Sequence, residues 1–352
     1  MELRVARVII SPSRCKEILV ATWCTDPSQK ANRFAAICLI AAVLLGVSSA
    51  AHSRPWPSAT LQSAQSKISV KTELVPLPVS VTDATGNVVA GLKLEDFRIY
   101  ENGRPQDISL FEDGDNPVSV GLIVDHSRSM GAKLPAVAAA VATFARSSNP
   151  QDEMFVVDFN DDVTVELMNG KAFTSDASEL AKAVRAVAAR GRTALYDAIT
   201  EGLVHLQLAH WARKALIIVS DGGDNASQQK FSQVLALARR SQVMIYSIVL
   251  VGADEEENPK ILQRLSKETG GIAYSPSSVE NVTDVSTRIA RDLREQYTLG
   301  FVPEKSDRNG SFRKLDVKVT APGRGRIHVR TRPGYFVGDE KQASIAPGKS
   351  AS

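Results

Sequence analysis

The stretch VSVGLIVDHSRSM at residues 118–130 decides the fold, because an almost uninterrupted apolar run stops abruptly at an aspartate. Two similar apolar runs follow, ALIIV at residues 215–219 and VMIYSIVLV at residues 243–251. Strands that are apolar on both faces belong to a parallel sheet covered by helices. Helical patterns separate these runs. The sequence therefore predicts a doubly wound α/β fold with a mostly parallel sheet.

The predicted helices and one hairpin complete this α/β region. The hairpin joins residues 153–160 to residues 163–168 and adds an antiparallel strand at the sheet edge. Helices are expected at residues 134–147, 177–189, 194–209, 228–241, 259–269 and 279–297.

Valine-rich sequence flanks the α/β region on both sides. Strands are expected at residues 68–81, 97–100 and 108–111 before it, and at residues 298–302, 312–320 and 327–331 after it. The turn Glu101-Asn102-Gly103 favours a hairpin between the second and third of these strands. Each flank alone is marginal in size. The economical hypothesis pairs the flanks, residues 67–117 and 298–337, into one sandwich-like unit with residues 118–297 inserted. Independent folding of each flank is the alternative.

The N-terminal segment has the order of an export signal. Residues 34–47 (FAAICLIAAVLLGV) carry no charge, Lys30 and Arg33 precede them, and small residues follow at positions 48–51. The apolar run is short for a membrane-spanning helix, which needs about 20 residues. Residues 1–51 are therefore expected to be a signal peptide or an uncleaved membrane anchor, in a periplasmic, secreted or anchored protein. Residues 52–66 have a linker composition, and residues 338–352 a disordered-tail composition.

Charge and cysteine content exclude several function classes. The formal charge is +3, and residues 1–33 hold six basic and three acidic residues, so the chain beyond the signal is close to neutral. The sequence contains no basic stripe of the kind that indicates nucleic-acid binding. The cysteines Cys15, Cys24 and Cys38 all fall within the expected signal segment. A processed chain would therefore have no disulfide, thiolate metal site or cysteine nucleophile.

Polar side chains stand where the predicted strands end. Asp125 ends the first apolar run and Asp221 follows the second. Ligand crevices in such sheets lie beyond the carboxyl ends of the strands. Ser127 and Ser129 alternate with Asp125, so an extended loop projects all three to one side. Thr193 precedes a predicted helix and adds a hydroxyl at the same edge.

Two carboxylates and three hydroxyls form an all-oxygen donor set. Hard cations prefer such donors, so we expect Mg²⁺ (or Mn²⁺ or Ca²⁺) to bind here. Because hydroxyls are neutral, the charge of the metal is only partly compensated. A carboxylate from a partner protein can then supply the last ligand.

This pattern resembles the metal-ion-dependent adhesion site of the von Willebrand factor type A (VWA) domain family. Residues 125–129 match its Asp-x-Ser-x-Ser loop, Thr193 its second loop and Asp221 its third. The resemblance implies that the hydroxyls contact the metal directly and that the aspartates act partly through water. Segments LKLEDF (92–97), YTLGF (297–301) and RPGYF (332–336) resemble exported bacterial VWFA-related proteins. Arg128 stands where the family usually has glycine; its guanidinium either repels the cation, steers an acidic partner, or points into solvent.

Structural interpretations compete with some of these assignments. Ser127 or Ser129 can cap a helix instead of binding metal. His126 alternates away from the site and is expected to be structural. A solvated turn accounts for Asp158, Asp161 and Asp162 better than a second metal site does.

The function expected from this set is that of an exported, divalent-metal-dependent binding or adhesion module. Its partner is a protein with an exposed carboxylate, it binds no nucleic acid, and it meets a membrane only through an uncleaved N-terminal segment. A structural or assembly protein with a metal-independent VWA domain is the alternative, followed by a metal-dependent hydrolase. An enzyme is not expected, because no nucleophile elbow, P-loop or dinucleotide-binding fingerprint follows a strand.

Overall fold

The computed structural model describes residues 74–167, 170–251, 257–304 and 310–337, all of which belong to one compact unit. The expected signal segment, the linker at residues 52–66, residues 68–73 of the first predicted strand, Met168 and the tail at residues 338–352 lie outside the described residues. Within the described ranges, no helix is both long enough and apolar enough to cross a membrane.

The predicted α/β sheet is confirmed. Its strand order is β10-β9-β8-β5-β6-β7, all neighbours pair in parallel except β6 and β7, and the predicted edge hairpin is the antiparallel β6–β7 pair. The central strands are buried along almost their whole length, which explains their apolar sequences. The strands are β5 (Ser119–Asp125), β6 (Glu153–Phe159), β7 (Val163–Glu166), β8 (Lys214–Ser220), β9 (Met244–Val249) and β10 (Ala273–Tyr274).

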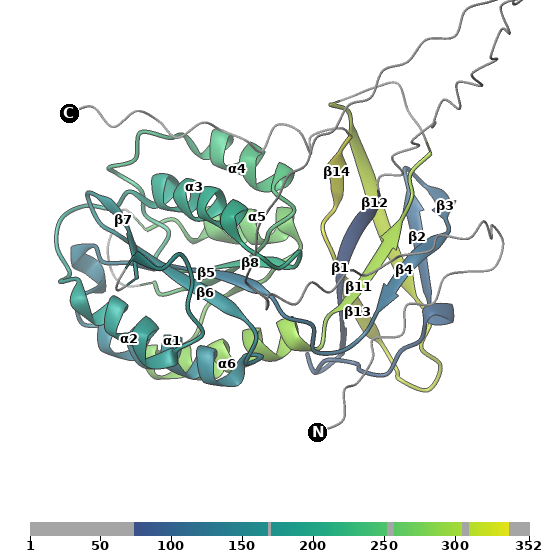
Figure 1. Ribbon diagram of the computed structural model, residues 1–352, viewed down its shortest axis with the longest axis horizontal. Coiled ribbons are helices and arrows are strands. Elements are labelled where there is room, and N and C mark those ends of the chain that lie inside the picture. The colour runs from purple at the N-terminus through teal and green to yellow at the C-terminus, as the bar shows by residue number, and fades with distance from the viewer. Residues whose placement is uncertain (1–73, 168–169, 252–256, 305–309, 338–352) are drawn as a thin grey trace, which may run out of the picture. The chain divides into compact units, whose positions relative to one another are not determined.

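Helices cover both faces of this sheet (Figure 1). One hydrophobic core lies between the sheet and α1, α2 and α6, and a second lies between the sheet and α3, α4 and α5. Asp176 caps α2 by accepting hydrogen bonds from the Ser178 and Glu179 amides, and Gly270 ends α5 with a φ of +85°. The helices are α1 (Leu134–Ser147), α2 (Ala177–Ala186), α3 (Leu195–His205), α4 (Phe231–Arg240), α5 (Pro259–Thr269) and α6 (Val282–Arg294).

The predicted helix at residues 279–297 was too long. Residues 279–281 form a 3₁₀ turn, α6 ends at Arg294, and Tyr297 already begins strand β11. The side chain of Tyr297 explains the change of structure. It lies in the sandwich core, where its hydroxyl accepts from the Leu92 amide at 3.0 Å and donates to the Val89 carbonyl at 2.9 Å.

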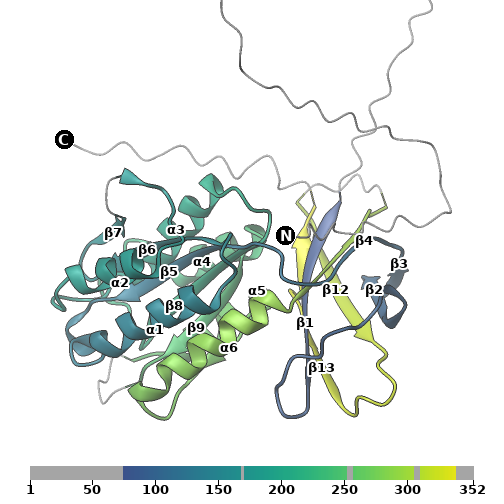
Figure 2. The same ribbon diagram turned by 60° about the horizontal axis from the view of Figure 1, so that its bottom comes forward.

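The flanking all-β unit predicted from the sequence is confirmed as two four-stranded sheets, ordered β13-β1-β11-β4 and β14-β12-β2-β3 (Figure 2). Strands from the two flanks pair directly, since β1 lies between β13 and β11, and β2 pairs with β12. Their inward side chains share one hydrophobic core. The strands are β1 (Val75–Asp83), β2 (Phe97–Glu101), β3 (Arg104–Gln106), β4 (Ile108–Glu112), β11 (Tyr297–Phe301), β12 (Phe312–Val319), β13 (Ile327–Arg330) and β14 (Gly334–Phe336).

The predicted hairpin between residues 97–100 and 108–111 was wrong. The Asn102-Gly103 turn joins β2 to the short strand β3, and Ile99 of β2 pairs with Gln106 of β3. A two-residue turn requires its partner strand to begin at once. Residues 108–112 then cross to the other sheet and pair with β11.

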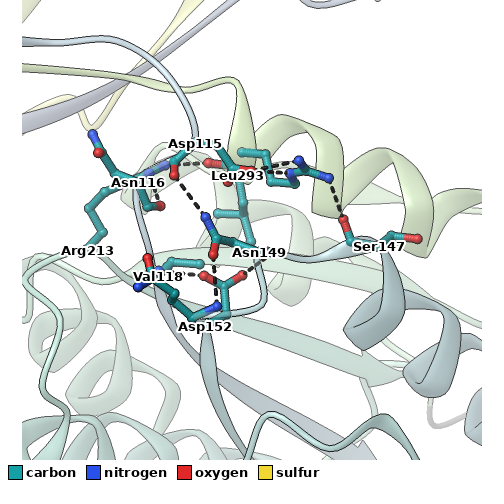
Figure 3. Close-up of polar contacts among 10 residues, drawn as sticks. Asp115, Asn116, Val118, Ser147, Asn149, Asp152, Arg213 and Leu293 are labelled. Carbon is teal, nitrogen blue, oxygen red and sulfur yellow. Dashed lines mark hydrogen bonds and ion pairs between the residues drawn. The ribbon is translucent and has the colours of Figure 1, made fainter. Parts of the chain in front are cut away.

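One arginine holds both chain crossings between the sandwich and the α/β region (Figure 3). Arg213 lies just before β8. It donates to the carbonyl of Asn116, where the chain enters the α/β region, and to the carbonyl of Leu293, where the chain leaves it. Beside it, Asp152 accepts from the Val118 amide at 2.8 Å. The two ends of the inserted region are thus tied to each other at the amino-terminal edge of the sheet.

Candidate metal centre

Two buried carboxylates lie at the carboxyl edge of the parallel sheet, where the sequence predicts them. Asp125 is the last residue of β5 and Asp221 follows the last residue of the neighbouring β8. Their exposed fractions are 0% and 4%. The Ser220 hydroxyl donates to Asp125 Oδ2 at 2.7 Å, and the Gly223 amide donates to Asp221 Oδ1 at 3.0 Å. Adjacent strand ends thus hold both carboxylates in fixed positions.

The two serines of the first loop connect these carboxylates. The Ser127 amide donates to Asp125 Oδ1 at 2.8 Å. Its hydroxyl lies 3.2 Å from the hydroxyl of Ser129, which donates to Asp221 Oδ2 at 2.8 Å. Ser127 stands at the N-cap of the 3₁₀ turn Arg128–Met130, but its side chain makes no capping hydrogen bond. Both hydroxyls therefore face the carboxylates rather than a helix end.

Thr193 is attached to the third loop through its backbone. Its amide donates to Asn225 Oδ1 at 2.9 Å, and its carbonyl accepts from the amides of Asn225 and Ala226 at 3.0 and 3.1 Å. Among the described residues, no hydrogen bond uses the Thr193 hydroxyl. The residue is buried, with 7% of its surface exposed. The second loop is therefore fixed beside the loop that begins at Asp221.

Burial makes this negative charge costly. It raises the pKa of Asp125 to about 6, although hydrogen bonds from Ser127 and Ser220 lower that pKa, and the nearby Asp221 raises it further. No described cationic side chain forms an ion pair with either carboxylate. A bound cation would supply the missing positive charge. The residues present therefore fit a hard divalent ion.

The donor set differs from a carboxylate or histidine cluster. In the described part of the chain, no group of three or more His, Cys, Asp or Glu side chains has the arrangement of a metal site. Here two carboxylates and hydroxyls converge instead. The Arg128 side chain is exposed at the rim.

A second layer lies directly behind the first loop. His126 is fully buried; its Nε2 lies 2.8 Å from the Val184 carbonyl and its Nδ1 lies 3.1 Å from Asp158 Oδ1. Both ring nitrogens thus face oxygen atoms of neighbouring residues. His126 is structural, as predicted. The prediction of a solvated turn was wrong for Asp158, because this residue lies inside β6 and is 2% exposed. It holds for Asp161, which is exposed and pairs with Arg192 at 3.0 Å.

Two supporting residues were missed in the sequence. Ser220 holds Asp125, and Asn225 holds the Thr193 backbone. For Ser220 the signal was available, since a polar residue in an apolar strand directly before Asp221 indicates a side chain directed at the site. For Asn225 the sequence indicates only a turn, because the contact joins loops that are 32 residues apart.

The α/β region is similar to a known protein family. The family model for the von Willebrand factor type A domain matches residues 119–288. Among curated proteins, no sequence matches the chain.

Solved structures with a similar fold include three bacterial proteins. The von Willebrand factor type A protein from Catenulispora acidiphila is 12% identical, with 79% of this chain and 78% of that chain covered and a TM-score of 0.46. The conserved hypothetical protein BatB from Bacteroides thetaiotaomicron is 17% identical, with 50% and 98% covered and a TM-score of 0.40. The domain of the type V pili tip protein Mfa5 from Porphyromonas gingivalis is 12% identical, with 50% and 95% covered and a TM-score of 0.43. Likenesses this distant concern the fold alone.

The strand order, the loop that follows β5 and the family match all lead to one assignment. Residues 119–288 of this chain form a von Willebrand factor type A domain.

Proposed function

We propose that the rim formed by Asp125, Ser127, Ser129, Thr193 and Asp221 binds one divalent cation and, through it, a carboxylate of a partner protein. One observation carries this proposal. Two buried carboxylates are connected by serine hydroxyls, and no cationic side chain among the described residues pairs with them. Mg²⁺ suits such oxygen donors best, and Mn²⁺ and Ca²⁺ are the other candidates.

The residues of the proposed site would have different roles in binding the ion. The hydroxyls of Ser127, Ser129 and Thr193 provide neutral donors, while Asp125 and Asp221 provide negative charge. Ser220 and Gly223 keep the two carboxylates oriented through the hydrogen bonds described above. When bound, the ion supplies an electrophilic centre that attracts an anionic partner. Neutral donors leave that charge only partly compensated.

A binding role is proposed in preference to catalysis. No described histidine contacts a hydroxyl of the site as a base would in a serine-histidine pair: His126 is buried and engaged with Val184 and Asp158. We further propose that the protein is exported, on the basis of the apolar segment at residues 34–47. A metal-dependent hydrolase is the enzymatic alternative. Phosphatase and esterase assays on metal-loaded protein test it.

Calorimetric titration with Mn²⁺ and Mg²⁺ tests the proposal. We expect one ion to bind per chain and Asp125→Ala to abolish binding. Asp161→Asn is the matched control, because Asp161 lies on a nearby loop but is exposed and paired with Arg192. Unchanged binding by Asp125→Ala would exclude the proposed ligand set.

A structural or assembly role without metal is the second candidate. The Ser129–Asp221 hydrogen bond favours it, since this bond is a direct contact between the loops that follow β5 and β8. Pull-down of partners with and without chelator separates the two roles. Partners retained in chelator support the second candidate, whereas partners lost in chelator support the first.

A further inference from the structure

A second site lies at the opposite end of the α/β sheet. A cavity of about 540 Å³ opens beside the start of β8, the end of α4 and the segment Arg332–Phe336. We call it the cationic cavity. β8 begins at Lys214 in this cavity and ends beside Asp221 at the metal centre, so the two sites are separated by the length of a strand, roughly 20 Å. The two sites therefore have no residue in common.

The charges in this cavity are of one sign. Lys214, Arg239, Arg240 and Arg332 line it, and no aspartate or glutamate is among its lining residues. Arg239 is neutralised from outside by Glu268 at 2.8 Å. Lys214 donates to the Leu206 carbonyl at 2.7 Å, and the charge of Glu153, which does not line the cavity, also acts on it. The remainder of the chain beyond residue 33 is close to neutral, which makes this local excess of positive charge unusual.

Arg332 is the most informative of these residues. It is 7% exposed, and its guanidinium donates to the Pro76 carbonyl at 2.7 Å. Its Nε is buried and has no hydrogen-bond partner among the described residues. Burial lowers the pKa of Arg332 to about 10, and no carboxylate in the described ranges forms an ion pair with it. A buried cation without an anion is costly unless a ligand supplies that anion.

Apolar and aromatic side chains form the rest of the wall. The Arg240 guanidinium lies 5.0 Å from the centre of the Phe336 ring, and that ring is 5.2 Å from the ring of Phe312, which is 45% exposed. Leu206 contributes an aliphatic surface. Gln242 at the same cavity has a φ of +58°, a left-handed conformation that residues other than glycine rarely adopt and that is concentrated at functional sites.

We propose that the cationic cavity binds a small molecule that carries an oxyanion, a carboxylate or a phosphate, on an apolar body. Lys214 and Arg332 provide the positive field for the oxyanion. Phe336 and Leu206 provide the surface for the apolar part. The volume is within the range of sites that hold small molecules. This ligand and its site are independent of the metal centre.

Calorimetry on the full chain in EDTA tests this proposal, with phenyl phosphate and benzoate as probes. Inorganic phosphate tests the head group alone, and benzyl alcohol tests the apolar body alone. We expect at least one of the aromatic anions to bind more tightly than both partial probes. Its affinity should fall at least tenfold in Arg332→Met and in Lys214→Met. Comparing the two anions shows whether the site takes carboxylates, phosphates or both.

Two controls keep the result interpretable. Arg104→Met removes an exposed arginine of β3 and should leave binding unchanged, as should Asp125→Ala at the metal centre. If Arg332→Met loses its folded melting transition, Lys214→Met decides the matter. Failure of both aromatic anions to bind at millimolar concentration, or unchanged affinity in the folded cationic-cavity variants, overturns the proposal.

Discussion

The hydroxyl of Ser129 donates a 2.8 Å hydrogen bond to Oδ2 of Asp221, a residue 92 positions further along the chain. This contact joins the loop after β5 to the loop after β8. It shows that oxygen atoms from different parts of the sequence face one another at the rim of the sheet. The proposed metal centre depends on this convergence.

Removing the Ser129 hydroxyl should weaken metal binding without unfolding the domain. Ser129→Ala deletes one neutral donor and removes the hydrogen bond to Oδ2 of Asp221, so we expect the affinity for Mn²⁺ to fall at least tenfold. Electron paramagnetic resonance of free Mn²⁺ measures this directly. Ser277→Ala is the matched control, because Ser277 is exposed, contacts Asn281 and lies outside the proposed ligand set. Equal affinity in the two variants would remove Ser129 from the ligand set.

Ser220 should tune the site without touching the metal. Its hydroxyl donates to Asp125 Oδ2, so Ser220→Ala removes one of the two hydrogen bonds that orient that carboxylate. Loss of such an outer contact typically costs about 10- to 100-fold in metal affinity. Ser220→Val is a poorer test, because valine adds volume at a fully buried position of the strand. An affinity within twofold of the unaltered chain in Ser220→Ala would show that Asp125 is oriented by other contacts.

The sequence places the two aspartates of the candidate site better than it places the residues around them. Asp125 and Asp221 are found because each ends an apolar strand, and the direction of parallel strands places both at one edge. Asp158 was misplaced because a carboxylate next to turn residues looks solvated, whereas its partner His126 belongs to another strand end. Such a pair depends on the sheet order, which periodicity does not specify.

Very short strands, and strand pairs that are far apart in the sequence, account for the remaining errors of the sequence-based prediction. β10 and β14 have two and three residues, too few to show an alternating pattern. β4 pairs with β11, nearly 190 positions away, so the local Asn-Gly turn favours the wrong partner. In contrast, α1 and α5 were predicted with their observed ends, because a proline lies within the first two residues of each helix and α5 stops at glycine.

A buried ion pair should make Asp292 important for stability. Its Oδ2 accepts hydrogen bonds from Tyr246 and Arg330, which connects α6 to β9 and β13. Asp292→Ala leaves the Arg330 charge with no carboxylate, and removing one partner of a buried pair costs about 3–5 kcal/mol. Urea denaturation followed by circular dichroism measures this cost. Asp284→Ala, an exposed residue of the same helix, should change stability by less than about 0.5 kcal/mol. A similar small effect for Asp292→Ala would contradict the assigned role.

Asp152 should make stability depend on pH. Burial raises the pKa of this carboxyl from 3.8 to about 6, although amide hydrogen bonds from Val118 and Asn149 lower it. The folded protein thus binds the proton more tightly than the unfolded chain does. The stability that protonated Asp152 contributes to the folded protein is fully present below about pH 4 and is lost as pH rises through about 6.

Asp152→Asn removes this titration. Relative to the variant, the unaltered chain should therefore lose stability between pH 4 and pH 6, by a difference of order 2–3 kcal/mol. Urea titrations of both proteins at half-unit pH steps measure the difference. If the two stability curves run parallel across this interval, Asp152 keeps an ordinary pKa.

The most direct measurement of the central claim is a crystal structure of the chain grown with Mn²⁺ and recorded at the manganese absorption edge. The account predicts one anomalous peak at the rim, within about 2.0–2.3 Å of the hydroxyl oxygens of Ser127, Ser129 and Thr193. Asp125 and Asp221 should bind the ion directly or through water. A peak elsewhere, no peak at saturating Mn²⁺, or a Thr193 hydroxyl directed away from the ion would contradict it.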